Sequence, residues 1–298
     1  ITGTSSFTTA ASDGGITLDS VNVLSGAVTL NTNSSGSSAN ATVDNGTTAL
    51  DIAASTIGGN LTLTSGAAAG ITDSGTVTVG GTLYAITDDN NGVVDMGTLA
   101  VTGSVDLATH GTGAATVVNA TALDLAASTV GGALTAEATA GNITDSGVLE
   151  ITGAATFTVA GGQSIYLNAV DGNDSDANKF DDQTNDDATD AALSFVASSG
   201  QLANVTIHDY DEMFSFPALT LTGNLEIEVA SRSEATQGDA GTTTNVAFTQ
   251  DGGFDIGGST TIKVTSGSKK HVKMEAILPS GDNLHLHCFI TTWPLLAP

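Results

Sequence analysis

Short stretches of alternating apolar and polar residues recur along the whole chain. Apolar side chains occupy every second position in segments such as 61–64, 77–79, 157–159 and 225–229. Alternation with a period of two is typical of a strand with one buried face. Gly-Gly or Ser-Gly pairs punctuate most strand ends, where a tight corner needs a positive φ. No segment shows a sustained period of 3.6, so the pattern predicts an all-β fold.

A long internal repeat and a shorter one accompany this alternation. Residues 48–59, Thr-Ala-Leu-Asp-Ile-Ala-Ala-Ser-Thr-Ile-Gly-Gly, return at 121–132 with an offset of 73 and two conservative changes. Leu61, Leu83 and Val105 mark a shorter spacing of 22. A coil of this size cannot bury its apolar face alone, whereas stacked coils share one continuous core.

The two spacings together predict a right-handed parallel β-helix, or β-solenoid, with coils of about 22–28 residues. Ten or so coils spaced by about 4.8 Å would give a rod roughly 50 Å long. The main alternative is a tandem of immunoglobulin-like sandwiches, which a unit of 73 residues could suit. That alternative leaves the shorter spacing unexplained, so the solenoid is favoured.

Composition narrows the set of partners. The chain of 298 residues has 40% hydrophobic residues, too many for a disordered chain, but only 13% charged and 4% aromatic residues. Six basic residues oppose 32 acidic ones, a net charge of −26. Such a surface repels phosphate backbones, so no nucleic acid partner is expected. No apolar run is long enough to cross a bilayer, so no membrane insertion is expected. The charge favours divalent cations or serves solubility alone.

The scarcity of cysteine is compatible with an exported bacterial protein. Cys288 is the single cysteine, so no intrachain disulfide can form. Residue 1 is Ile, and no charged and apolar signal-peptide pattern follows it. We therefore expect the chain to be a processed product or a fragment.

Several repeats resemble a known family. Gly-Asn-Leu-Thr-Leu-Thr-Ser-Gly (59–66), Gly-Asn-Ile-Thr-Asp-Ser-Gly (141–147) and Gly-Ala-Ala-Thr-Phe-Thr-Val (153–159) are similar to repeats of filamentous-haemagglutinin-like exoproteins of two-partner secretion. The resemblance covers residues 45–170 well and 200–265 loosely. It implies a right-handed β-helix that is secreted or held on a bacterial cell surface and mediates adhesion. It brings no catalytic residues, and the secretion domain of that family has no counterpart here.

An acidic segment interrupts the pattern at 171–190, where eight of twenty residues are Asp. Such charge density predicts a loop insertion. Its alternating oxygen-bearing residues are candidate calcium ligands, although the Gly and Glu of a regular calcium loop are missing; they are Asp171, Asp174, Asp176, Asn178 and Asp182. The alternative is a solvated acidic loop without metal. A smaller Asx-rich run at 88–92 predicts a turn. No other cofactor is expected.

The C-terminal stretch 269–298 differs in composition from the solenoid of residues 1–268. It holds three of the six basic residues, three of the four prolines and the single Trp. The open end of a solenoid must be capped or joined to another chain. The stretch is therefore predicted to cap the last coil or to dock on another subunit, unless it is foreign to the solenoid. The candidate contact residues are Phe289, Trp293, Leu295 and Leu296.

These features predict a structural or adhesive extracellular rod that is not an enzyme. Its expected partners are further copies, joined end to end as a filament or surface coat, or a receptor on a host or cell surface. The alternative is a β-helix that binds or cleaves polysaccharide, for which the cluster at 208–212, His-Asp-Tyr-Asp-Glu, is the best catalytic candidate. Ice binding would need regular threonine ranks, and the outward positions vary too much for that.

Overall fold

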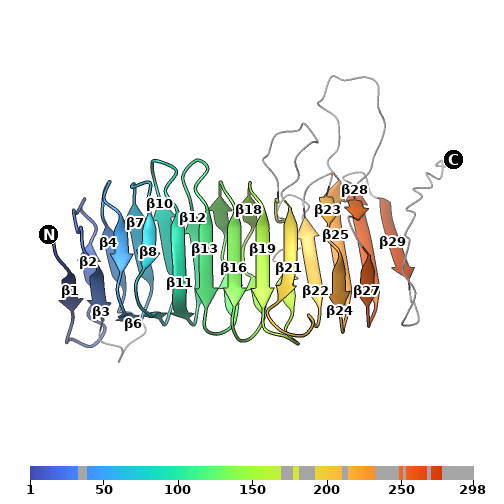
Figure 1. Ribbon diagram of the computed structural model, residues 1–298, viewed down its shortest axis with the longest axis horizontal. Helices are drawn as coiled ribbons and strands as arrows, with labels where there is room; N and C mark the ends of the chain where they lie inside the picture. Colours follow the sequence, from blue (N-terminus) through green and yellow to red (C-terminus); the bar gives the residue numbers. More distant parts are fainter. Residues whose placement is uncertain are drawn as a thin grey trace, which may run out of the picture.

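The described chain is a rod of stacked β-coils. The computed structural model describes residues 1–32, 39–168, 177–180, 192–209, 214–231, 248–250, 253–266 and 270–276, and all structural features below belong to these residues. Figure 1 shows the strands side by side along the long axis, from β1 at one end to β29 at the other. The coils form a β-solenoid of about 9 turns. No helical segment with the length and hydropathy of a membrane span occurs in these residues.

Two long sheets form opposite walls of the rod. Sheet A contains β1 (Ser5–Thr8), β3 (Val28–Asn31), β5 (Leu50–Ile52), β6 (Ser55–Ile57), β8 (Ile71–Asp73), β9 (Val77–Val79), β11 (Val94–Val101), β13 (Ala115–Asn119), β16 (Leu134–Ala138), β19 (Ala155–Val159) and β21 (Leu193–Ala197). Sheet B contains β2 (Ile16–Leu18), β4 (Ala41–Asp44), β7 (Leu61–Ser65), β10 (Leu83–Thr87), β12 (Ser104–Ala108), β14 (Leu123–Leu125), β15 (Ser128–Val130), β17 (Ile143–Asp145), β18 (Leu149–Ile151), β20 (Ile165–Leu167), β22 (Val205–Asp209), β25 (Leu225–Ser231), β28 (Thr260–Ser266) and β29 (Lys270–Ala276). Two short parallel pairs complete the wall beyond β21: β23 (Phe214–Phe216) with β26 (Phe248–Gln250), and β24 (Leu219–Leu221) with β27 (Phe254–Ile256).

The pairing confirms the parallel solenoid and excludes the sandwiches. Among the described strands every ladder is parallel except that of β28 with β29. Leu61, Leu83 and Val105 pair in register, as their spacing of 22 predicts. Other coils are a few residues shorter than predicted, for example between the paired Ala115 and Leu134. Inward-facing side chains of all these coils form one buried apolar cluster from Ile16 to Ile262.

One length of the long repeat corresponds to a whole number of coils plus one half. A half-turn is either long, with one strand of about five residues, or split, with two short strands at a corner. From the start of the first copy of the repeat to the start of the second, the chain makes seven half-turns: β5 with β6, β7, β8 with β9, β10, β11, β12 and β13. The second copy therefore begins on the opposite wall. Residues 50–57 form β5 and β6 in sheet A, whereas residues 123–130 form β14 and β15 in sheet B.

A third copy follows at 214–221. It forms β23 and β24 with the same strand lengths and the same two-residue gap as the first two copies. A long strand begins 11 residues after the start of each copy, at Leu61, Leu134 and Leu225. Because β22 and β25 on either side both belong to sheet B, the third copy lies on the sheet A wall again. We call residues 50–57, 123–130 and 214–221 copies 1, 2 and 3 of the split-turn motif.

Asparagines at one corner link each coil to the next. The Asn60 Oδ1 accepts the backbone N–H of Thr82 in the next coil at 2.9 Å, and Asn40, Asn142, Asn204 and Asn224 accept equivalent bonds. A Cβ on Gly81 would lie 2.1 Å from the Asn60 Oδ1. A Cβ on Gly223 or Gly258 would meet the Oδ1 of Asn204 or Asn224 at 2.3 Å in the same way, so at these corners a glycine precedes the residue whose N–H the asparagine accepts.

Candidate functional site

The acidic segment contributes to the solenoid itself. Residues 177–180 lie inside the predicted loop of 171–190, yet they stack between two coils, and Ala177 and Phe180 are buried. The backbone of Lys179 bonds to Leu149 and Ile151 at 2.8 Å each. Its ammonium forms an ion pair with Glu150. The predicted single insertion therefore contains a four-residue piece of coil.

One predicted calcium ligand is described, and its amide already has partners. Asn178 is fully buried; its Oδ1 accepts from the Leu149 N–H at 2.8 Å, and its Nδ2 donates to the Asp145 carboxylate at 2.7 Å. Asp171, Asp174, Asp176 and Asp182 lie outside the described residues, so calcium binding stays a prediction. Within the described ranges, no group of three or more metal-ligating side chains occurs. At 88–92 the predicted turn is confirmed, with Asn90 and Asn91 at positive φ.

The predicted C-terminal contact residues are not described. Phe289, Trp293, Leu295 and Leu296 all lie outside the described ranges. Only β29 of the stretch 269–298 is described, and it runs antiparallel to β28 from Lys270 to Ala276. Subunit docking therefore stays a prediction.

The first two residues of the catalytic candidate at 208–212 lie on opposite faces of one strand, and residues 210–212 lie outside the described residues. Asp209 is fully buried on the core side of β22, whereas His208 points outward, with its Nε2 3.7 Å from the Glu228 Oε1. Lys263 of the following coil pairs with the same Glu228 carboxylate. These three outward side chains form a polar row across three coils, and its ion pair between Glu228 and Lys263 links neighbouring coils.

Copies 1 and 2 of the split-turn motif form hydrogen bonds with backbone N–H and C=O groups of the strand that stacks before them. In copy 1 the Ser55 Oγ accepts the Leu30 N–H at 2.9 Å, and the Ala53 N–H donates to the Val28 carbonyl at 2.9 Å. Copy 2 repeats both bonds. There the Ser128 Oγ accepts from Leu107 at 3.0 Å, and the Ala126 N–H donates to Val105 at 2.8 Å.

Copy 3 has replaced both of these hydrogen-bonding residues. Pro217 stands where Ala53 and Ala126 stand, and it has no N–H. Leu219 stands where Ser55 and Ser128 stand, and it has no hydroxyl. Accordingly, β21 is the last strand of sheet A and forms no ladder with β23 or β24. The two replacements explain physically why the sheet A wall breaks here.

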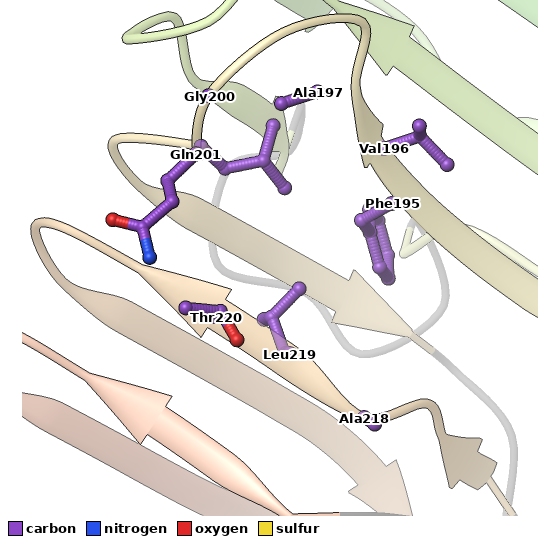
Figure 2. Close-up of a pocket in the computed structure, with 9 residues that line it drawn as sticks. Phe195, Val196, Ala197, Gly200, Gln201, Ala218, Leu219 and Thr220 are labelled. Atoms are coloured by element: carbon purple, nitrogen blue, oxygen red, sulfur yellow. The ribbon is translucent and has the colours of Figure 1, made fainter.

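A pocket of about 400 Å³ opens at this break. Its lining comes from three parts of the chain: Phe195, Val196 and Ala197 of β21, Gly200, Gln201 and Leu202 of the following loop, and Ala218, Leu219 and Thr220 at β24. Figure 2 shows Phe195 and Leu219 on opposite sides of the opening, with the amide of Gln201 near Thr220. The pocket is open to solvent and falls in the size range of about 300–1,000 Å³ typical of ligand sites.

A row of phenylalanine rings supports the floor of the pocket. Phe157 and Phe195 stack with ring centroids 6.0 Å apart, and Phe195 and Phe216 stack at 5.2 Å. Phe254 of the next coil contacts Phe216 edge to face at 5.7 Å. The core therefore stays continuous beneath the break, and only the backbone ladder is interrupted.

The fold and the repeated motif define a repeat β-solenoid protein. A family described as "Repeats of unknown function (DUF5649)" matches residues 38–87 and 112–185, less than half of the chain. Each matched stretch contains one of the first two copies of the split-turn motif. Comparison with curated proteins and comparison with solved structures gave no match.

The pocket could not be expected from the pattern of residues that predicted the solenoid. Copy 3 shares only the equivalents of Ala54 and Thr56 with copy 1, so it does not stand out as a repeat. In the sequence, copy 3 differs from copies 1 and 2 by the loss of a Ser and the gain of Pro217 at aligned positions. These differences can be recognised only after the strand spacing has aligned the three copies.

Proposed function

We propose that the chain is a stiff, acidic segment of an extracellular rod, secreted or held on a bacterial cell surface, with a structural or adhesive role. The observation that supports it best is the single apolar cluster running from Ile16 to Ile262. Because each coil covers the apolar side of its neighbour, bending the rod would expose core to water. A continuous core and backbone ladders suit a spacer that must hold its length.

The surface is consistent with this role. The paired outward positions along sheet A are mostly small and polar, namely Asp51, Thr72, Asp95, Thr116, Thr135, Thr156 and Ser194. Such a surface disfavours nonspecific association with other proteins, and the net charge of −26 makes neighbouring rods repel one another. Contact with a receptor or another copy would then be confined to special places on the rod.

End-to-end assembly is the second part of the proposal. Strands β1 and β2 each pair on one side only, with β3 and β4. A free strand edge is a template for another strand. A further coil, from the same chain or from a second copy, would continue both sheets with the same parallel geometry.

Negative-stain electron microscopy of the purified chain tests the proposal. The rod proposal predicts straight, narrow particles at low protein concentration, and end-to-end assembly predicts uniform fibres as the concentration rises. Short rods at every concentration would remove the filament part and leave an adhesin segment. Rounded particles, or rods that bend freely, would contradict the structural role.

A further inference from the structure

The break in sheet A is the one step between described coils at which a wall of the rod has no strand ladder. Sheet A is continuous from β1 to β21, and beyond the break β24 pairs again with β27. Sheet B crosses the same step with the ladder of β22 and β25, which runs from Val205 with Leu225 to Asp209 with Val229. The two sections of the rod are therefore joined by a full ladder on one wall only.

Side-chain and corner contacts hold copy 3 against β21 in spite of the break. The rings of Phe195 and Phe216 stack in the core, with centroids 5.2 Å apart and an angle of 15° between the planes. At the corner, the Thr222 N–H donates to the Leu202 carbonyl at 2.9 Å. Nearly parallel rings can slide and stay in contact, whereas a ladder fixes the spacing of its two strands. The contacts on this side therefore keep the coil seated without fixing the distance between β21 and β24.

The pocket at the break provides space for a bend. Its volume of about 400 Å³ lies between β21 and β24, with Phe195 and Leu219 on opposite sides of the opening (Figure 2). A rotation that brings β24 toward β21 narrows the pocket and keeps both Phe rings covered. The opposite rotation would expose the rings to water, which the hydrophobic effect opposes. A bend at this step therefore has a preferred direction, toward sheet A.

We propose that the rod contains a hinge at this step, about which its two sections bend toward sheet A, with the ladder of β22 and β25 as the pivot. Hinges act through a few residues at the ends of elements that absorb the change in backbone angles. Gly200, in the loop after β21, has a φ of +66° and open space around it, so this loop can absorb such a change. Each section keeps its own length, and only the direction of the rod changes. The hinge is independent of adhesion, export and assembly, since it rests on the ladders, the rings and the pocket.

Double electron–electron resonance between two spin labels tests the hinge in the full chain. Three label pairs are compared in a Cys288→Ser background, each spanning five coil steps, or about 24 Å. The first pair crosses the break along sheet A, the second crosses the same step along sheet B, and the third lies along sheet A before the break. In this order the pairs are Thr116→Cys with Asp255→Cys, Asp124→Cys with Thr261→Cys, and Thr72→Cys with Ser194→Cys.

The distance distribution of the first pair should be about twice as wide as the other two, with the added population at shorter distances. Equal widths for all three pairs would overturn the hinge, and straight particles in the microscope would then leave the rod proposal standing. A second pair as broad as the first would also overturn it, because the whole C-terminal section would then be loosely stacked.

A variant of copy 3 tests the cause of the hinge. Pro217→Ala/Leu219→Ser gives copy 3 the two residues of copies 1 and 2, and it should narrow the distribution of the first pair to that of the third. Leu219 is buried, so Pro217→Ala alone replaces the double variant if the latter loses the circular dichroism spectrum of the native chain. A distribution that stays equally broad in a folded variant would contradict the origin of the hinge in the break.

Discussion

Replacing Asn119 with alanine should destabilise the solenoid far more than the removal of a surface side chain. Asn119 is fully buried at the end of β13. Its Oδ1 accepts the Val101 N–H at 2.8 Å, and its Nδ2 donates to the carbonyls of Val101 at 3.0 Å and Ala122 at 2.7 Å. One side chain thus fixes the corner that leads into copy 2, as Asn45 fixes the corner before copy 1.

The size of the effect follows from the groups left behind. Alanine would leave the Val101 N–H and the Ala122 carbonyl without their side-chain partner in a dry corner. Each buried polar group that loses its partner costs about 1–3 kcal/mol. The free energy of unfolding should therefore fall by about 2–6 kcal/mol. Thr116→Ala, three residues earlier on the outward face, should change it by less than about 0.5 kcal/mol.

Guanidinium unfolding followed by circular dichroism would measure both variants. The slope of the free energy of unfolding against guanidinium concentration should be compared between the variants, because stacked repeats can lose cooperativity. Amide exchange at Val101 gives a local reading, since its N–H depends on Asn119 alone for a partner in the next coil. Equal stability of Asn119→Ala and Thr116→Ala, with unchanged exchange at Val101, would refute the role assigned to the buried amide.

Three further predictions concern the corners, the surface and the acidic segment. Gly81→Ala should lower the melting temperature because its Cβ would meet the amide of Asn60, whereas Gly97→Ala, with open space around it, should not; equal shifts would contradict the corner model. Burial raises the pKa of the Asp106 carboxyl, so the folded state holds its proton more tightly than the unfolded state. The stability that the protonated carboxyl contributes is lost as the pH rises through the folded pKa. Asp106→Asn should therefore raise the melting temperature at pH 7, with a gain that vanishes in acid; a pH-independent difference would argue against this. Calcium binding by the segment 171–190 predicts heat in a calorimetric titration and a rise in melting temperature, and the absence of both would end that hypothesis.

The sequence is sufficient to predict the stacking but not the path of the long repeat. Alternation with a period of two and the spacing of Leu61, Leu83 and Val105 identify parallel coils, and the pairing confirms them. The offset of 73 gives no direct sign that the repeat covers seven half-turns. The number of half-turns in the repeat depends on the order of split and long half-turns, for instance on the two successive long strands β12 and β13. These positions are set by corner geometry, which single residues encode weakly.

The high charge of the acidic segment predicts a loop throughout 171–190, and this prediction is wrong for residues 177–180. Eight Asp in twenty residues predict a loop, and the prediction overlooks Ala177 and Phe180, whose apolar side chains enter the core. Spacing groups Asn178 with the candidate calcium ligands, yet a buried Asn can equally pair with the backbone, as Asn45 and Asn119 do. Residue type and spacing cannot separate the two uses, because both need the same amide oxygen. Only the position relative to a coil corner distinguishes them.

Disulfide formation between coils tests the central architecture most directly. In a Cys288→Ser background, Thr135→Cys and Thr156→Cys place two thiols on paired positions of β16 and β19. Neighbouring strands lie about 4.8 Å apart, close to the Cα separation that disulfides accept. Parallel stacked coils predict rapid oxidation of this pair and none between Thr135→Cys and Thr144→Cys, which lies in the opposite sheet. Failure of the first pair, or equal oxidation of both, would contradict a solenoid wound in this register.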